Sequence, residues 1–235
     1  MSIFEKEWIL NFTQCYPNGQ LKFSELNNIL QVTASEHAEI IGFGYKAMFE
    51  VRQSWVLSRM LIEIDRLPKY TQNVKVRTWI QDFTGNRSIR NFQLLFNDEV
   101  IVSASSLWAV FNIKLRKADT LALSTDHMIF HRDRIATKNN VEKIDGNLSF
   151  DLRCNYKVKL SDLDIVNHAN NVKYMEWCFD AMDPKDILSG NIRMLEMNFL
   201  KELNYADEVS IKENNNTTFT IEKDDRTHFL MRVTR

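Results

Sequence analysis

The sequence predicts an α+β protein in which one unit, a long helix with antiparallel strands, occurs twice. Most of the chain consists of short β-branched and aromatic runs, two stretches have helical apolar spacing, and part of the first half returns in the second. Turn signals such as Thr84-Gly85-Asn86 and Asn97-Asp98 separate neighbouring strand-like runs, which favours hairpins and an antiparallel sheet.

One helix is expected in each half. The first is predicted over residues 24–41, with Ser24 as its N-cap and its apolar residues on one face. The second is predicted over residues 170–182, with Asn170 or a neighbour as its N-cap. It is apolar on most sides, which indicates burial, and Pro184 is expected to end it.

Runs rich in β-branched and aromatic residues predict the strands. The predicted strands are Ser54–Ile64, Val74–Ile80, Arg87–Phe96, Val102–Phe111, Tyr156–Leu160, Ile192–Leu200, Glu208–Glu213, Thr218–Lys223 and His228–Val233.

The internal repeat relates residues 62–76 to residues 197–211. Tyr70 falls on Tyr205, and the alternation of apolar side chains carries over. Each half therefore contains a loop, a helix and several antiparallel strands. Because one such unit wraps its sheet around its helix, and two units side by side form one continuous sheet, we expect a double hotdog fold.

The expected division is an N-terminal unit over residues 1–112, a connector over residues 113–150 and a C-terminal unit over residues 151–235. The whole chain has 235 residues, of which 44% are hydrophobic and 26% are charged. These values exclude disorder and allow a sizeable buried core.

Charge, glycine and cysteine content exclude several classes of function. The net charge of -1 is not that of a nucleic-acid binder, which carries a basic surface. The six glycines disfavour phosphate-binding loops, since average usage would give roughly 16. The three cysteines lack metal-ligand spacing, so we expect no disulfide framework, metal or other cofactor, and a cytoplasmic location. No apolar run reaches the roughly 18 residues of a membrane-spanning helix.

The loop Ser161–Asn171, SDLDIVNHANN, carries the chemistry that the sequence offers. Asp164 and His168 have the spacing of a general acid–base pair. The loop leads into the second predicted helix, where Asn170 and Asn171 stand and where backbone N–H groups can stabilise an oxyanion. The alternative interpretation is an Asx-rich capping turn with a surface histidine.

The corresponding loop of the first half, Tyr16–Ser24, lacks this pair. Aligned on its turn, Gln20 takes the place of His168 and Tyr16 takes the place of Asp164. Two copies of which one is chemically equipped indicate a single-site enzyme that grew from a symmetric dimer.

On these residues the sequence resembles the acyl-ACP thioesterases, double hotdog hydrolases that release fatty acids from acyl carrier protein (ACP). In the first half the resemblance rests on NGQLKFSELNNILQ, EHAEIIGFG and SWVLSRMLIEIDRLPKY followed by VRTW. In the second half it rests on SDLDIVNHANNVKYMEW and FLKELNYADEV. It covers nearly the whole chain and indicates a bacterial member, similar to the plant fatty acyl-ACP thioesterases.

The family pattern D-L-D-x-N-x-H-x-N-N is matched at Asp164, His168, Asn170 and Asn171. Its first asparagine has no counterpart, because Val166 stands there and Asn167 comes one place later. The Glu-Cys pair of plant members corresponds to Glu202-Leu203, so the glutamate is kept and the cysteine is missing. A mechanism with a cysteine nucleophile is therefore disfavoured.

The resemblance implies hydrolysis of a fatty acyl thioester. Asp164 or Glu202, oriented by His168, would activate a water or attack the carbonyl, and Asn167 would join them through a local shift. The expected partner is acyl carrier protein, which is acidic, and the protein is expected to be a monomer or a homodimer. Weak candidates for docking the carrier are the connector bases Lys114, Arg116, Arg132 and Arg134.

Three alternatives stay open. A hotdog hydrolase of acyl-CoA would differ in its carrier, and a non-catalytic acyl-binding protein would bind acyl-ACP tightly without turnover. A hotdog dehydratase also uses a histidine with a carboxylate.

Overall fold

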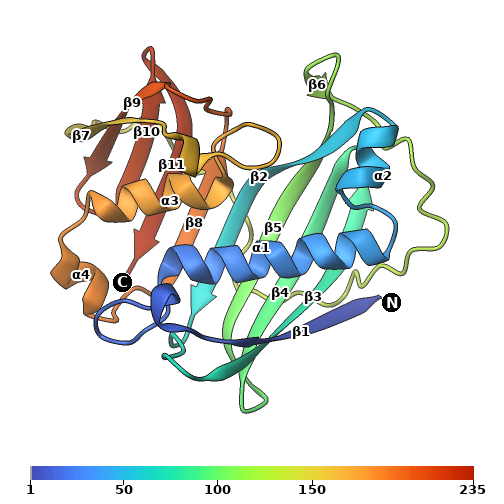
Figure 1. Ribbon diagram of the computed structural model, residues 1–235, viewed down its shortest axis with the longest axis horizontal. Coiled ribbons are helices and arrows are strands. Elements are labelled where there is room, and N and C mark those ends of the chain that lie inside the picture. The colour runs from blue at the N-terminus through green and yellow to red at the C-terminus, as the bar shows by residue number, and fades with distance from the viewer. Residues whose placement is uncertain (1) are drawn as a thin grey trace. The chain divides into compact units, whose positions relative to one another are not determined.

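The computed structural model describes residues 2–235, and the chain divides between Val141 and Glu142 into two compact units (Figure 1). Both units combine helices with antiparallel strands, which confirms the predicted α+β class. Among the described residues, no helix is long and apolar enough to cross a membrane.

The first unit contains β1 (Ile3–Ile9), η1 (Phe12–Gln14), α1 (Phe23–Ile40), α2 (Tyr45–Glu50), β2 (Gln53–Ile64), β3 (Asn73–Thr84), β4 (Arg87–Phe96), β5 (Glu99–Asn112) and β6 (Lys117–Ala118). Its strands pair antiparallel in the order β1-β3-β4-β5-β2, and β6 pairs with β5. Figure 1 shows α1 lying across one face of this sheet. Leu26, Ile29 and Leu30 of α1 are completely buried, so burial of this face stabilises the helix on the sheet.

The second unit contains β7 (Asp151–Lys157), η2 (Leu160–Asp162), α3 (Asn171–Asp180), α4 (Pro184–Leu188), β8 (Met194–Phe199), β9 (Glu208–Asn214), β10 (Thr218–Lys223) and β11 (Arg226–Thr234). Its strands pair antiparallel in the order β7-β9-β10-β11-β8. Counted from the start of each unit, both sheets follow the order first, third, fourth, fifth, second. The predicted internal repeat is therefore confirmed.

The repeat extends to individual turns. Thr71 and Ala206 both have left-handed backbones, with φ of 68° and 65°. The N–H of Thr71 donates to the carbonyl of Leu10 at 3.1 Å, and that of Ala206 donates to the carbonyl of Val158 at 3.0 Å. The helical part is longer in the first unit, because α1 has 18 residues against 10 in α3 and α2 follows it.

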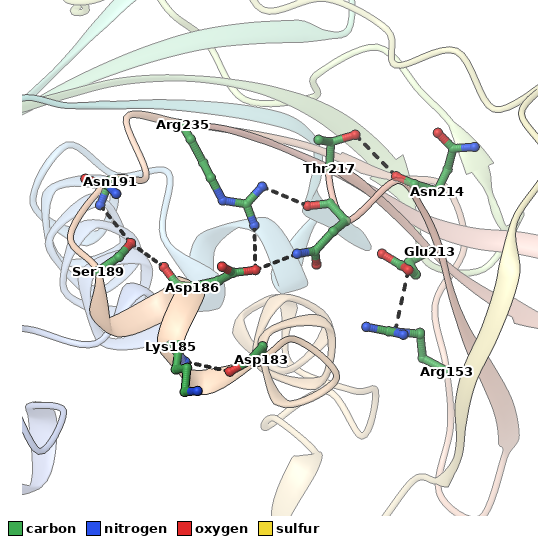
Figure 2. A network of polar contacts seen from close by, with 11 residues as sticks. Arg153, Asp183, Lys185, Asp186, Ser189, Asn191, Glu213, Asn214, Thr217 and Arg235 are labelled. Atoms are coloured by element: carbon green, nitrogen blue, oxygen red, sulfur yellow. Dashed lines mark hydrogen bonds and ion pairs between the residues drawn. The ribbon is translucent and has the colours of Figure 1, made fainter.

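Two predicted helix boundaries are wrong. Helix α1 begins at Phe23, so Ser24 lies inside it; the N-cap is Lys22, which forms no side-chain cap. Helix α3 ends at Asp180, and Pro184 instead begins α4, where its missing N–H costs nothing. Asp183 caps α4 by accepting the N–H of Lys185 at 2.8 Å, as Figure 2 shows.

Among the strands, β7 and β1 differ most from the prediction. Strand β7 ends at Lys157, earlier than expected, because Leu160 begins the short helix η2. Strand β1 was not predicted from the sequence, since Glu5, Lys6 and Glu7 interrupt its apolar residues. It is an edge strand of its sheet, where charged side chains reach solvent.

Much of the predicted connector packs along the first unit. The N–H of Ala136 donates to Oδ1 of Asn91 at 2.9 Å, and the indole N–H of Trp79 donates to the carbonyl of Arg134 at 2.9 Å. The N–H of Lys138 donates to Oε2 of Glu63 at 2.8 Å. These bonds satisfy polar groups of the sheet and fix the course of an otherwise irregular segment.

Candidate active site

A tight turn forms the centre of the candidate loop. The N–H of Asp164 donates to the carbonyl of His168 at 2.9 Å, and the N–H of Asn167 donates to the carbonyl of Asp164 at 3.0 Å. Oδ1 of Asp164 also accepts the N–H groups of Val166 at 3.0 Å and His168 at 3.3 Å. The Asp164 carboxylate therefore holds the loop in an Asx-type turn that presents His168.

The first unit contains the same turn without the same chemistry. The N–H of Tyr16 donates to the carbonyl of Gln20 at 2.8 Å, and the N–H of Gly19 donates to the carbonyl of Tyr16 at 2.8 Å. Tyr16 thus stands in the place of Asp164, and Gln20 in that of His168, as the sequence predicts. Neither side chain can act as a general base at neutral pH.

Helix α3 begins directly after this loop. Asn170 is its N-cap, and its Oδ1 accepts the N–H of Val172 at 2.9 Å, which confirms the predicted cap. Three backbone N–H groups before the helix already have protein acceptors: that of His168 bonds Asp164, that of Ala169 bonds the Leu203 carbonyl at 2.8 Å, and that of Asn170 bonds the Asp162 carbonyl at 2.9 Å. These three N–H groups are therefore committed to the loop, and an oxyanion would have to be met by other groups at the start of α3.

Glu202 lies beside His168. Nδ1 of His168 is 3.4 Å from Oε2 of Glu202, and the two side chains are 28% and 35% exposed. Both groups can therefore meet water and a substrate while remaining partly shielded from solvent. An imidazole facing a carboxylate is an arrangement that can take a proton from water and return it to a leaving group.

The backbone around Glu202 is fixed by the last strand of the unit. The carbonyl of His228 on β11 accepts the N–H of Leu200 at 2.9 Å and of Lys201 at 3.2 Å. Nδ1 of His228 donates to the carbonyl of Glu202 at 3.1 Å. Burial lowers the pKa of His228, with Lys201 and Lys223 adding to the effect, so it is neutral at pH 7. His228 was not predicted from the sequence as part of the site; it acts here through contacts with the backbone.

Two tyrosines support the same region from inside the unit. Tyr174 of α3 is 3% exposed and packs against Phe199 and Phe229, and its hydroxyl donates to the Lys201 carbonyl at 3.4 Å. Tyr156 donates to Oδ2 of the buried Asp162 at 2.9 Å. Burial, reinforced by Asp162, raises the pKa of Tyr156 to about 12, so it remains a donor.

Neither cysteine of the second unit has the environment of an activated thiolate. Cys178 is completely buried in α3, and burial raises the pKa of its thiol strongly. Cys154 is exposed on β7, and desolvation raises its pKa as well. Within residues 2–235, no three histidine, cysteine or acidic side chains form a group that could hold a metal ion.

The four docking candidates all lie on the first unit. Nε of Arg132 donates to Oδ1 of Asp82 at 2.9 Å, and this bond lowers the pKa of Asp82. The guanidinium of Arg134 lies 4.4 Å from the centre of the Trp79 ring. Lys114 and Arg116 are exposed in the turn between β5 and β6.

Comparison with known families identifies related proteins over nearly the whole chain. Residues 1–125 match the acyl-ACP thioesterase N-terminal domain, and residues 147–232 match the acyl-ACP thioesterase C-terminal domain. The resemblance inferred from the sequence is confirmed.

Curated relatives are plant enzymes of low identity. The oleoyl-acyl carrier protein thioesterase of Coriandrum sativum is 26% identical over 219 residues, which are 83% of this chain and 59% of that protein. The palmitoyl-acyl carrier protein thioesterase of Arabidopsis thaliana is 28% identical over 194 residues, 76% of this chain and 47% of that protein. The chain thus spans about half the length of the curated relatives it matches.

Solved structures show the same fold. An acyl-ACP thioesterase from Bacteroides thetaiotaomicron is 27% identical and superimposes with a TM-score of 0.89, covering 98% of this chain and 96% of that one. The 12:0-ACP thioesterase from Umbellularia californica, at 19% identity, has a TM-score of 0.81 over 98% of this chain and 96% of its own. The predicted double hotdog fold is confirmed.

Proposed function

The chain belongs to the acyl-ACP thioesterase family, and we propose that it hydrolyses the thioester between a fatty acyl group and acyl carrier protein. The products are a free fatty acid and the thiol of the carrier. The observation that carries this proposal is the pair formed by His168 and Glu202, 3.4 Å apart at the start of α3. In the first unit the corresponding positions are Gln20 and Leu67, which form no such pair.

In the proposed reaction, Glu202 and His168 act together on a water molecule. The pair takes a proton from the water as its oxygen attacks the thioester carbonyl carbon. The carbon–sulfur bond then breaks, and the thiolate leaves with a proton that the pair returns. Because a thiol is far more acidic than an alcohol, little assistance is needed for its departure.

Charge that develops on the carbonyl oxygen requires donors near the start of α3. The positive end of the α3 dipole is suited to this role, because α3 begins at Asn171 directly after the loop. The side chain of Asn170 is committed to the cap through its oxygen, so it offers only its amide N–H groups.

Asp164 has a different proposed role from that of Glu202. Its Oδ1 atom accepts two backbone N–H groups of its own loop, so we assign it to positioning His168. Glu202, by contrast, faces the imidazole of His168 directly, at 3.4 Å. Glu202 is therefore the stronger candidate for the base.

The preference for acyl carrier protein over CoA is proposed from the family, and an assay with both substrates tests it. The purified protein is incubated with a series of acyl-ACPs and with the matching acyl-CoAs, and released fatty acids are measured by mass spectrometry. We expect faster release from acyl-ACP at equal acyl chain length. Faster release from acyl-CoA would assign the protein to the rival carrier. Tight binding of acyl-ACP without release of acid would contradict hydrolysis altogether.

A further inference from the structure

A group of exposed apolar side chains lies in the second unit, on the segments around the candidate active site. Leu160 begins η2, Ile165 stands in the loop that leads into α3, and Tyr205 lies in the turn between β8 and β9. These three side chains, which we call the apolar rim, are 77%, 83% and 62% exposed. Single exposed apolar residues are ordinary on protein surfaces, but several together beside a site mark a surface for a partner.

Backbone hydrogen bonds bring the apolar rim next to the pair of ionisable side chains. The N–H of Ala169 donates to the carbonyl of Leu203 at 2.8 Å, and each of these residues directly follows one member of the pair. The N–H of Ala206 donates to the carbonyl of Val158 at 3.0 Å, which holds the turn of Tyr205 beside the chain that enters η2. A macromolecule that brings a substrate to the pair therefore meets the apolar rim.

Two exposed lysines accompany the apolar rim. Lys159 directly precedes η2, and Lys201 directly precedes the glutamate of the pair. Within residues 2–235, neither lysine forms a salt bridge with an acidic side chain, whereas Lys223 of the same unit pairs with Asp207 at 2.6 Å. Nζ of Lys159 lies instead 5.2 Å from the centre of the Tyr156 ring. The positive charge of the two lysines is thus available to an acidic partner.

The equivalent surface of the first unit lacks this available charge. Phe12 begins η1 as Leu160 begins η2, and it is also exposed. The positions of the two lysines are taken by Asn11, which caps η1, and by Arg66, which pairs with Glu99. Of these two equivalent surfaces, the one that combines apolar side chains with available positive charge is therefore the one that holds the ionisable pair.

We propose that the apolar rim, together with Lys159 and Lys201, is a surface on which acyl carrier protein docks. This inference rests on the proposed hydrolysis, because a substrate attached to the carrier brings the carrier up to the pair. An acidic helix that presents a few apolar side chains fits this surface, since its carboxylates meet the lysines and its apolar side chains cover the rim. The surface belongs to the second unit and is distinct from the basic side chains of the connector in the first.

Binding of holo-ACP, the carrier with its thiol arm and no acyl group, tests the surface without any turnover. Fluorescence anisotropy of labelled holo-ACP gives its Kd for the full chain. We expect Leu160→Gln and Lys159→Gln each to raise this Kd about three- to tenfold, because one removes apolar contact area and the other removes a charge. All variants in this test change exposed side chains, so their Tm should equal that of the parent protein.

Each of these variants has a matched control. Phe12→Gln makes the same kind of change at the equivalent position of the first unit, and Lys185→Gln removes an exposed lysine of α4 in the second unit. Both controls should bind holo-ACP with the Kd of the parent protein. An unchanged Kd in Leu160→Gln, or an equal rise in Phe12→Gln, would overturn the proposal.

Steady-state kinetics separates failure of the docking surface from failure of the proposed hydrolysis. In Leu160→Gln, we expect KM for acyl-ACP to rise with the Kd for holo-ACP, and kcat/KM for a small acyl thioester without the carrier to stay unchanged. Hydrolysis of acyl-ACP with the parent KM in this variant would overturn the docking surface alone. A parent protein that binds holo-ACP through Leu160 and hydrolyses neither substrate would overturn the hydrolysis and leave the surface standing.

An anionic lipid surface is the other partner that apolar side chains with lysines could meet, and sedimentation with vesicles distinguishes it. The vesicles contain phosphatidylcholine and phosphatidylglycerol in about equal amounts. We expect the parent protein to remain in the supernatant. Sedimentation with the vesicles that is lost in Leu160→Gln, together with an unchanged Kd for holo-ACP, would assign the surface to a membrane and overturn the proposal.

Discussion

His168 and Glu202 lie with Nδ1 and Oε2 3.4 Å apart, and their counterparts in the first unit are Gln20 and Leu67. The correspondence follows from one backbone bond in each unit. The N–H of Ala169 donates to the carbonyl of Leu203 at 2.8 Å, and the N–H of Leu21 donates to the carbonyl of Pro68 at 2.8 Å. The same backbone thus presents an ionisable pair in one unit and no titratable group in the other.

If this pair acts as one base, its members must be energetically coupled. We expect His168→Ala and Glu202→Gln each to lower kcat for acyl-ACP hydrolysis by about 10²- to 10⁴-fold. The double variant should be no slower than the slower single variant, because either change disables the same step. If the losses of kcat multiply in the double variant, the two residues have independent roles, which would contradict their action as one base.

Asn167 allows its backbone and side-chain roles to be separated. Its φ is 65°, and Gly19, with a φ of 80°, occupies the same place in the first unit. We expect Asn167→Gly to keep its kcat, and Asn167→Ala to lose about 1 kcal/mol of stability, since alanine disfavours this conformation. Denaturant unfolding and steady-state kinetics measure both effects. Equal loss of kcat in the two variants would instead indicate that the amide takes part in the reaction.

His228 should make stability depend on pH in the weakly acidic range. Its pKa is lowered by burial first and then by Lys201 and Lys223, with Asp207 opposing them. The unfolded chain therefore binds a proton more readily than the folded one, and the free energy of unfolding falls as pH drops below about 6.5. The stabilisation from His228 is lost completely once the pH is below the lowered pKa that His228 has in the folded state.

Urea unfolding of the parent protein and of His228→Gln between pH 5 and pH 8 measures this contribution. We expect a smaller decrease of unfolding free energy in the variant over the range just below pH 6.5. Identical pH dependence in the two proteins would contradict a lowered pKa for His228.

The basic side chains of the connector should affect the binding of acyl-ACP and not the hydrolysis step. Arg132→Gln keeps the side chain polar beside Asp82 and removes one positive charge from an exposed position. We expect KM for acyl-ACP to rise about two- to fivefold at low salt, with less effect at high salt. KM for a small acyl thioester without the carrier should not change. The control is Lys46→Gln, which removes another exposed positive charge of this unit. An equal rise of KM for acyl-ACP in this variant would exclude a local docking role for Arg132.

The repeat made most of the fold predictable from the sequence. Strands β4 and β10 have the predicted bounds, and the alignment of Tyr16 with Asp164 is reproduced by the hydrogen bonds of both turns. Helix ends were less predictable, because α1 begins without a capping side chain and α4 begins at a proline that was expected only to stop a helix.

The candidate site was predictable only where the sequence carries its chemistry locally. Asp164 and His168 lie four residues apart in one loop, whereas Glu202 was placed by the family resemblance. His228 contributes through its backbone and one ring nitrogen from a distant strand, so no local pattern marks it.

The most direct test compares the two repeated loops. His168→Ala and Gln20→Ala change equivalent positions of the same turn, and the kcat of each for acyl-ACP hydrolysis is measured beside the parent protein. We predict a loss of about 10²- to 10⁴-fold for His168→Ala and near-parent activity for Gln20→Ala. Full activity of His168→Ala would contradict an active site at the start of α3.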